Sequence, residues 1–423
     1  MEPAYTESAG IPRVTPPEPP YSGRRLSASL RSLRYRNYRL LWLGTLISSA
    51  GDWMDQVALN WLVYQLTGSA VHLGLLNLCR FTPILVFTLI GGVVADRVER
   101  RRLVFTTQTV AMLLAFALAA LVSTGVVQFW MALAVAVGRG TMMSFNQPAR
   151  QSLISDLVPT ESLTNAIALN AATHNLTRII GPAIGGGLIA TVGVAGAFYF
   201  NGASFLAVLG ALALMRFSEQ RAVRPIAPSI ARDLARGLQY LRGEPALRML
   251  VMLALVPMVF GLPYQTMLTV FAKDVLRVGG GGLGLLMACS GVGAFLGALF
   301  IAASGVGRTR IMFIGLVAFG ASLVLFSLSH WLLLSVPALI AVGMSQQVYM
   351  TSNNTLIQMN VAPEYRGRVL STLFLNRGMV PLGTMIAAFA TAAFGPQIAI
   401  GGMGAVLVLM AILAAFFTPP PSS

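Results

Sequence analysis

Charged side chains are scarce in this chain. They make up 10% of its 423 residues, against about 25% in typical soluble domains. Apolar residues reach 56%, above the usual range of about 45–50%. A chain of this composition cannot cover several separate domains with polar surface. The composition therefore excludes a soluble multidomain protein.

Cysteine and histidine are also rare. Cys79 and Cys289 lie in different apolar segments, and the three histidines are far apart in the sequence. No cysteine or histidine has a partner at metal-ligand spacing, and no glycine-rich phosphate loop follows a strand. We therefore predict that the protein is not an enzyme and has no metal site, no cofactor and no nucleotide-binding module.

The sequence instead contains long runs without any charged residue, such as 103–138 and 311–363. Each run can hold one or two helices of the roughly 20 residues that cross a bilayer. We predict an all-α membrane protein with twelve transmembrane helices, an even number that places both termini on the same side. The predicted helices are 38–64, 70–94, 103–123, 127–146, 163–191, 197–216, 247–271, 282–304, 311–329, 332–351, 369–394 and 397–417.

The net charge of +15 comes from 28 arginines and a single lysine, Lys273. Apart from Arg277 and four arginines inside apolar spans, every arginine falls in the N-terminal tail or in alternate connecting loops. This positive-inside pattern predicts a multi-pass protein of the cell membrane with both termini in the cytoplasm. The charge orients the chain among anionic lipids, so we expect membrane lipids and no nucleic acid as partners.

The two halves of the chain resemble each other. Residues 153–161 and 356–364 share a Leu-Ile, Val, Pro and Glu pattern about 200 residues apart, a weak duplication typical of transporters built from two pseudo-symmetric bundles. Residues 218–246, which link the two halves, are interpreted as carrying an amphipathic helix on the membrane surface, with an unstructured connector as the alternative. The predicted organisation is a disordered basic tail (1–37), a six-helix bundle (38–217), a cytoplasmic linker (218–246), a second six-helix bundle (247–417) and a short tail (418–423).

A charged loop after the second predicted helix carries the most specific motif. Gly92 to Arg101 resembles the signature of the major facilitator superfamily, with Glu99 in place of the usual glycine. The resemblance implies an inner-gate latch, in which the small Gly92 lets two helices approach closely and Asp96 pairs with Arg150 or with a helix N-terminus near Gly367. An ordinary basic loop is the alternative. The residues assigned to this motif are Gly92, Asp96, Arg97, Arg100, Arg101 and Arg150.

Further segments are similar to the third drug:proton antiporter family, in the branch of the enterobactin exporter. They include Gly51-Asp52-Trp53, the run from Asn146 to Arg150, and the Gly-Pro-x-x-Gly-Gly motif. The last also resembles the antiporter motif of the fifth helix, although Thr177 replaces an expected glycine. Close helix packing explains the same residues without any function. This motif comprises Gly181, Pro182, Gly185 and Gly186.

Ionisable residues inside the spans cost at least about 2.5–3.5 kcal/mol each near a helix centre. From their depths we predict that two acids and three arginines of the N-terminal half form one buried network. In the functional interpretation, Asp52 or Asp55 carries a proton with Arg139 as partner; in the other, the network only fixes packing. The ionisable residues inside the spans are Asp52, Asp55, Arg80, Arg139 and Arg178 in the first half and Arg377 in the second. Candidate cavity residues are Gln56, Asn60, Asn146, Gln346 and Asn376.

Together these features predict a monomeric secondary transporter of the major facilitator fold. The resemblance implies export of a hydrophobic or amphipathic small molecule, drug-like or siderophore-like, in exchange for protons and by alternating access. Movement of lysophospholipid or another lipid is the alternative within transport. A membrane sensor or scaffold without transport activity is the alternative from a different class.

Overall fold

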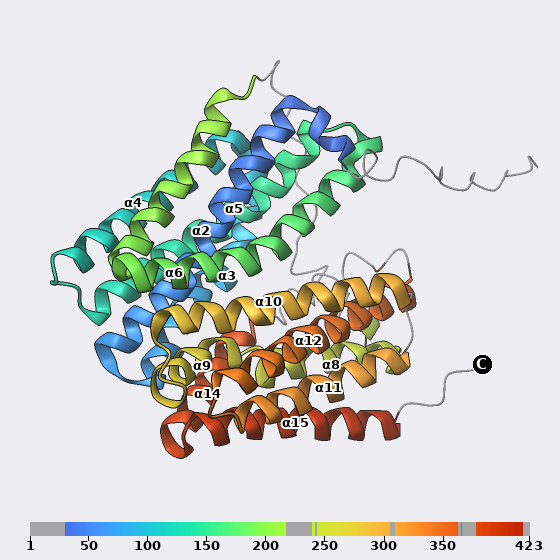
Figure 1. Ribbon diagram of the computed structural model, residues 1–423. Helices are drawn as coiled ribbons and strands as arrows, with labels where there is room; N and C mark the ends of the chain where they lie inside the picture. Colours follow the sequence, from blue (N-terminus) through green and yellow to red (C-terminus); the bar gives the residue numbers. More distant parts are fainter. Residues whose placement is uncertain are drawn as a thin grey trace, which may run out of the picture.

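The computed structural model describes residues 30–216, 239–241, 243–304, 309–362, 365 and 378–417. Helices of the first half form the N-terminal bundle, drawn from blue to green in Figure 1. They are α2 (Arg36–Thr67), α3 (Ala70–Arg97), α4 (Arg100–Ser123), α5 (Phe129–Leu157) and α6 (Thr160–Leu214). The short 3-10 helix η1 (Arg31–Arg34) precedes them.

The α6 segment holds two spans. Its 55 residues would measure roughly 80 Å as one straight helix, far more than a bilayer. Gly193 breaks it with a φ of 78°, a conformation that only glycine adopts without strain. The break lies between the fifth and sixth helices predicted from the sequence.

The second half forms the C-terminal bundle, drawn from yellow to red. Its helices are α8 (Pro245–Phe260), α9 (Tyr264–Val270), the π-helical turn η2 (Phe271–Val275), α10 (Gly279–Ser304), α11 (Thr309–Ser327), α12 (Leu332–Asn360), α14 (Val380–Phe394) and α15 (Pro396–Phe417). The helix predicted over 247–271 is interrupted after Phe260, where a turn runs from Gly261 to Pro263 and Pro263 has no N–H to donate. The first part of the helix predicted over 369–394 lies outside the described residues.

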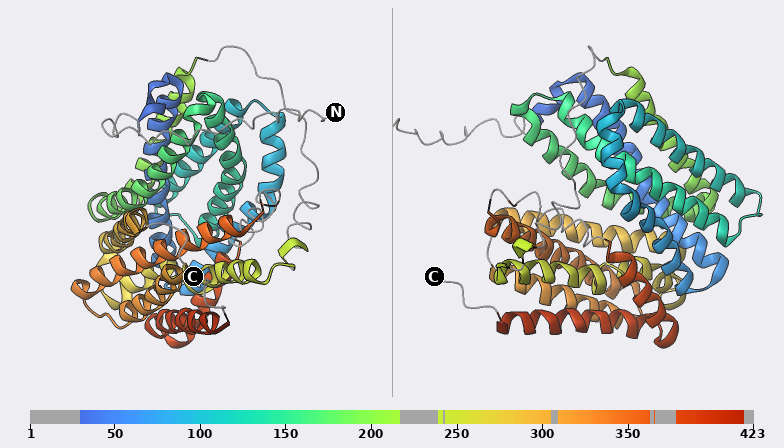
Figure 2. Two further views of the ribbon diagram at one scale, coloured as in Figure 1. Left: turned by 90° about the vertical axis from the view of Figure 1, so that its right-hand side faces the viewer. Right: turned by 180° about the vertical axis from the view of Figure 1, so that it is seen from behind.

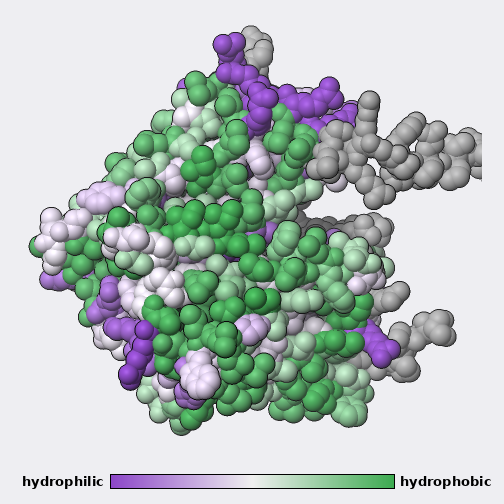
Figure 3. Space-filling model, viewed as in Figure 1, coloured by the Kyte–Doolittle hydropathy of each residue, from purple (hydrophilic) through white to green (hydrophobic). Residues whose placement is uncertain are grey.

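Twelve spans are found within the described ranges. Eight helices are long and apolar enough to cross a membrane when α6 is counted once, and α14 is a shorter apolar helix. These make nine with α14 included. Counting α6 as two spans adds one more, and the more polar helices α2 and α5 bring the number to twelve. Figure 3 shows apolar side chains over the outward flanks and hydrophilic ones gathered toward the two ends, as a bilayer requires.

The two bundles meet at one end and diverge at the other (Figures 1 and 2). We call the end where α2 begins and α15 ends the basic end, because it carries Arg36, Arg39 and Arg100. The opposite end is called the far end. Toward the far end α6 packs against α10 and α3 against α14, whereas a notch separates the bundles at the basic end in Figure 3. The structure is thus open toward the basic end.

The predicted boundary of the N-terminal tail at residue 37 is too late. Ser32 is fully buried; its backbone N–H donates to the Asn165 side chain at 2.9 Å, and its hydroxyl donates to the Ser162 carbonyl at 3.0 Å. The basic segment before α2 therefore packs on the start of α6. Most of the linker, including its predicted amphipathic helix, lies outside the described residues.

Candidate functional site

The centre of the N-terminal bundle holds an ion-pair network of two acids and one arginine. Asp52 and Asp55 are three residues apart on α2, a spacing that puts both carboxylates on one helix face. Arg139 of α5 reaches both: Nη2 lies 2.9 Å from Asp52 Oδ1, and Nη1 contacts Asp55 Oδ1. The structure therefore brings Asp52, Asp55 and Arg139 together at the centre of the bundle.

The two carboxylates differ sharply in environment. The side chain of Asp55 is 1% exposed, and its Oδ1 also accepts a hydrogen bond of 3.2 Å from the Asn201 amide. The side chain of Asp52 is 49% exposed. Asp55 is therefore enclosed within the bundle, while Asp52, beside the same arginine, is partly accessible.

Asp52 opens onto a cavity of about 110 Å³ inside the N-terminal bundle. This volume corresponds to roughly three or four water molecules. Asn146 donates a hydrogen bond of 2.9 Å to the Thr107 hydroxyl there. The cavity is lined by Asp52, Arg80, Thr107, Gln108, Ala111, Arg139, Met142, Met143, Asn146, Gln147, Arg150 and Phe205. Its arginines outnumber its acids, so the cavity is electropositive when Asp52 is ionised.

Arg178 does not belong to this network, contrary to the prediction of one cluster. Its Nη2 donates to Gln346 Oε1 of α12 at 3.3 Å, and the Tyr264 hydroxyl donates to the same oxygen at 3.3 Å. The depth of Arg178 in α6 resembles that of Asp52 in α2, but α6 turns this side chain toward the C-terminal bundle. Arg377 lies outside the described residues.

The inner-gate motif is only partly described. Arg100 bonds Asp156 at the end of α5, and Arg97 is exposed. Arg101 lies 3.5 Å from the Ala213 carbonyl. The side chain of Asp96, together with Gly367, falls outside the described part, while Arg150 lines the cavity beside Asp52.

Gly91, and not Gly92, is the glycine at which α3 approaches α5 closely. A Cβ on Gly91 would collide with the Ser144 carbonyl of α5, whereas one on Gly92 would meet no atom within 4 Å. The expectation that Gly92 lets two helices approach is therefore wrong for this conformation, because the helix turns Gly91 toward α5.

The Gly-Pro-x-x-Gly-Gly motif of α6 forms helix contacts on two sides. A Cβ on Gly181 would lie 2.5 Å from the Trp53 Cβ, and one on Gly185 would lie 2.9 Å from the Met54 Cα, both on α2. Gly186 faces the other bundle, where its Cβ would lie 2.7 Å from the Gly284 Cα. The motif thus packs α6 against α2 and against α10.

The other candidate cavity residues are dispersed. Asn146 lines the charged cavity and Gln346 bonds Arg178, whereas Asn60 is buried and Gln56 half-buried. Asn376 lies outside the described residues. In the described part of the chain, no group of three His, Cys, Asp or Glu side chains could hold a metal ion.

The sequence did not predict two sets of polar contacts, one in the ion-pair network and one at the far end. Asn201, the partner of Asp55, is a polar residue in the apolar span 197–214, and that contrast could have identified it. At the far end, the Tyr64 hydroxyl donates to Asp274, and Lys273 Nζ lies 3.2 Å from the Tyr64 carbonyl. These contacts join α2 to η2 and tie the two bundles together.

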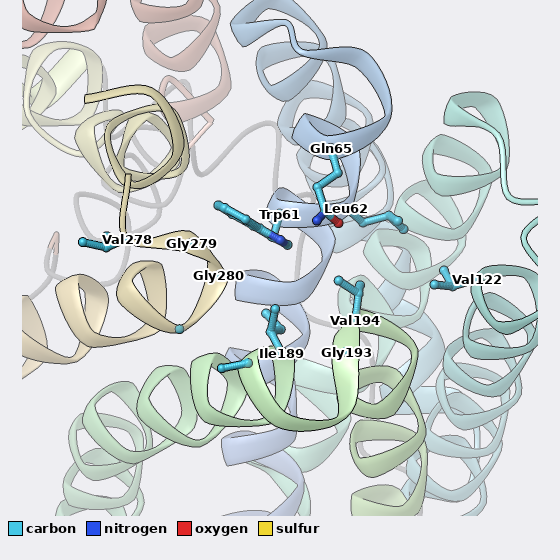
Figure 4. Close-up of a pocket in the computed structure, with 12 residues that line it drawn as sticks. Trp61, Leu62, Gln65, Val122, Ile189, Gly193, Val194, Val278, Gly279 and Gly280 are labelled. Carbon is cyan, nitrogen blue, oxygen red and sulfur yellow. The ribbon is translucent and has the colours of Figure 1, made fainter. Parts of the chain in front are cut away.

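A larger cavity of about 560 Å³ lies at the far end between α2, α4, α6 and α10. Figure 4 shows Trp61 and Leu62 of α2 near Ile189 and Val194 of α6, with Val278 beside the start of α10. No ionisable side chain lines this cavity. The smaller cavity, by contrast, is lined by Asp52 and by Arg80, Arg139 and Arg150.

Comparison with known proteins places the chain among membrane transporters. It is 28% identical to the staphyloferrin A transporter of Staphylococcus aureus, covering 82% of this chain and 87% of that protein. It is 30% identical to the multidrug efflux pump Tap of Mycobacterium tuberculosis, over 84% of this chain and 87% of that protein.

The fold agrees with solved transporters. A bacterial homologue of the human lysosomal transporter Spinster, in an inward-facing and unoccupied conformation, aligns with a TM-score of 0.68 and 17% identity over 90% of this chain and 96% of that one. The family described as transmembrane secretion effector matches residues 27–422. The chain therefore belongs to the transmembrane secretion effector family of major facilitator transporters and is a secondary transporter that exports small molecules.

Proposed function

We propose that the protein exports a hydrophobic or amphipathic small molecule in exchange for protons, with Asp52 as the proton carrier. The observation that carries this proposal is that Arg139 is shared by two carboxylates of which only Asp52 reaches the cavity. A proton can reach Asp52 through water in that cavity, whereas the Asp55 carboxylate is enclosed. The names of the relatives, a staphyloferrin transporter and multidrug efflux pumps, support export of small molecules as cargo.

The network suits the gain and loss of one proton. When Asp52 takes up a proton, its ion pair with Arg139 is lost, but Arg139 keeps Asp55 as its counter-charge. Neither state leaves the arginine buried without an acid, so both avoid the largest desolvation cost. Asp55 acts as a fixed partner and Asp52 as the exchangeable one.

The experiment compares Asp52→Asn with Asp55→Asn. For Asp52→Asn we expect loss of uphill export with retained downhill exchange, because the proton step is lost while alternation survives. Asp55→Asn should impair uphill export less completely, since Asp52 can still bind a proton. The measurement is accumulation of a labelled amphiphile driven by an imposed pH gradient in proteoliposomes.

Glu244→Gln is the matched control, because it neutralises an exposed acid that precedes α8 and makes no cap hydrogen bond. Its accumulation should equal that of the wild type. If Asp52→Asn still concentrates the amphiphile in response to the pH gradient, Asp52 is not the carrier and the network serves packing.

The basic end is proposed to face the cytoplasm, with both termini there. Arginines gather at this end, as the positive-inside pattern requires, and the bundles diverge there, so the structure is an inward-open state.

A reporter fused after Ser423 should therefore read as cytoplasmic, and one inserted at Val278 as external. An insertion at Val126, between α4 and α5, serves as a second external site. An external signal from the C-terminal fusion would contradict this orientation.

A further inference from the structure

We propose that Arg178 binds a negatively charged group of the exported molecule, so that the cargo is an anionic amphiphile. This inference deepens the export function proposed above and rests on it. The class that fits is a molecule with a carboxylate, or a comparable single negative group, on an apolar body.

The first argument is the charge balance of the spans. Arg178 lies 18 residues into α6, roughly 27 Å from its start. No acid forms an ion pair with it among the described residues, and its hydrogen-bond partner is the neutral amide of Gln346. Asp52 and Asp55 are both committed to Arg139. An arginine at this depth is costly, and an anionic ligand would neutralise it.

The second argument is position. Arg178 projects from the N-terminal bundle, while Gln346 and Tyr264 belong to α12 and α9 of the C-terminal bundle. The backbone is held close as well, because a Cβ on Gly291 of α10 would lie 2.9 Å from the Arg178 carbonyl oxygen. A ligand at Arg178 therefore touches both bundles at the surface that must open and close in alternating access.

The third argument is the apolar surrounding. His174 lies one turn before Arg178 on the same side of α6, and its ring centroid is 5.9 Å from that of Trp53. Met350 contributes a thioether sulfur 3.8 Å from the Gln346 amide nitrogen. An indole and a polarizable thioether offer contacts for an apolar body next to the guanidinium.

The hydrogen bond to Gln346 is easily exchanged. At 3.3 Å it is longer than a charge-assisted bond between arginine and a carboxylate, which measures about 2.7–2.9 Å. An anionic group would replace this bond with a stronger one. A cationic molecule would be repelled, and a neutral one would gain no more than Gln346 already provides.

The charged cavity of the N-terminal bundle fits such a cargo less well. It also contains arginines, but Arg139 is already paired with Asp52 and Asp55. Its volume of about 110 Å³ suits a few waters rather than an amphiphile. We therefore assign the anion to Arg178 and the proton to Asp52.

The test uses two fluorescent probes that differ only in charge, 11-(dansylamino)undecanoate and its carboxamide. Dissociation constants are measured by titration of the full-length protein in detergent without a proton gradient. We expect the wild type to bind the carboxylate about tenfold or more tightly than the amide. Arg178→Gln should abolish this preference, and Arg178→Lys should retain part of it.

A control variant separates this site from other charges. Arg102→Gln removes an exposed arginine that pairs with Glu99 and should keep the preference. Equal binding of the two probes by the wild type would overturn the proposal, and so would a preference that survives in Arg178→Gln or disappears in Arg102→Gln.

Failure of this site can be distinguished from failure of proton coupling. Asp52→Asn should retain the preference for the carboxylate even though it loses uphill export. The two proposals can therefore fail separately. If the probe preference depends on Arg178 but export does not respond to the pH gradient, the anion site is supported and the proton carrier is rejected.

Discussion

Replacing Arg139 with leucine is expected to destabilise the N-terminal bundle by about 3–5 kcal/mol, the usual cost of removing one partner of a buried ion pair. Arg139 is 8% exposed and Asp55 1%. Without the guanidinium, Asp55 keeps a hydrogen bond from the neutral Asn201 amide but no ion pair among the described residues, so its buried negative charge is poorly compensated. The loss should appear as a lower melting temperature of the purified protein and as reduced yield in the membrane.

A second substitution tests this explanation. Asp55→Leu together with Arg139→Leu removes both buried charges and should restore much of the stability, because apolar groups of similar volume often replace a buried pair at little cost. The double variant should remain unable to couple export to protons, since Asp52 then lacks its partner. A double variant no more stable than Arg139→Leu alone would show that the arginine acts through packing, for example against Phe205 at 5.9 Å.

Replacing Gly284 with valine is expected to lower the export rate roughly tenfold or more. A Cβ at this position would lie 2.5 Å from the Gly186 Cα and would also meet the Pro182 carbonyl. Both contacts are backbone atoms, which cannot turn aside as a side chain can. Overpacking typically costs about 1–3 kcal/mol, and here that cost falls only on the state in which α6 and α10 touch. The population should shift away from the closed far end.

Cross-linking measures this shift. Gln65→Cys and Val278→Cys place thiols on either side of the far-end cavity, in a background without Cys79 and Cys289. Gly284→Val should reduce their cross-linking. Gly187→Val is the control, because a Cβ there would meet no atom within 4 Å. Equal cross-linking and export in both valine variants would refute a role for the Gly186–Gly284 contact in closing the far end.

The sequence predicts depth within the membrane well and direction around a helix poorly. Hydropathy and helix rise place Asp52 and Arg139 at compatible depths, and the structure joins them. The same reasoning assigned Arg178 to that cluster, although α6 turns it toward Gln346. Direction depends on how helices pack, and in α6 both faces are lined with glycine and apolar residues, so no amphipathic pattern indicates which face meets which bundle.

Local backbone breaks were also only partly predictable. Gly193 stands between two predicted spans, so its positive φ agrees with the sequence pattern. The turn from Gly261 to Pro263 divides a segment that reads as one apolar helix, because apolar content alone does not reveal a lost backbone hydrogen bond. The superfamily motif predicted a close helix approach near residue 92 but missed the residue that makes it, since one position changes the direction by about 100°.

The contact between Tyr64 and η2 gives the protein an intrinsic chemical reporter. Lys273 is the only lysine in the chain, and its ammonium lies 4.9 Å from the centre of the Tyr64 ring and close to the Tyr64 carbonyl. Each transport cycle that opens the far end must free this amine. The single lysine therefore makes amine acylation by a membrane-impermeant reagent a direct readout of the far-end gate, with no engineered label.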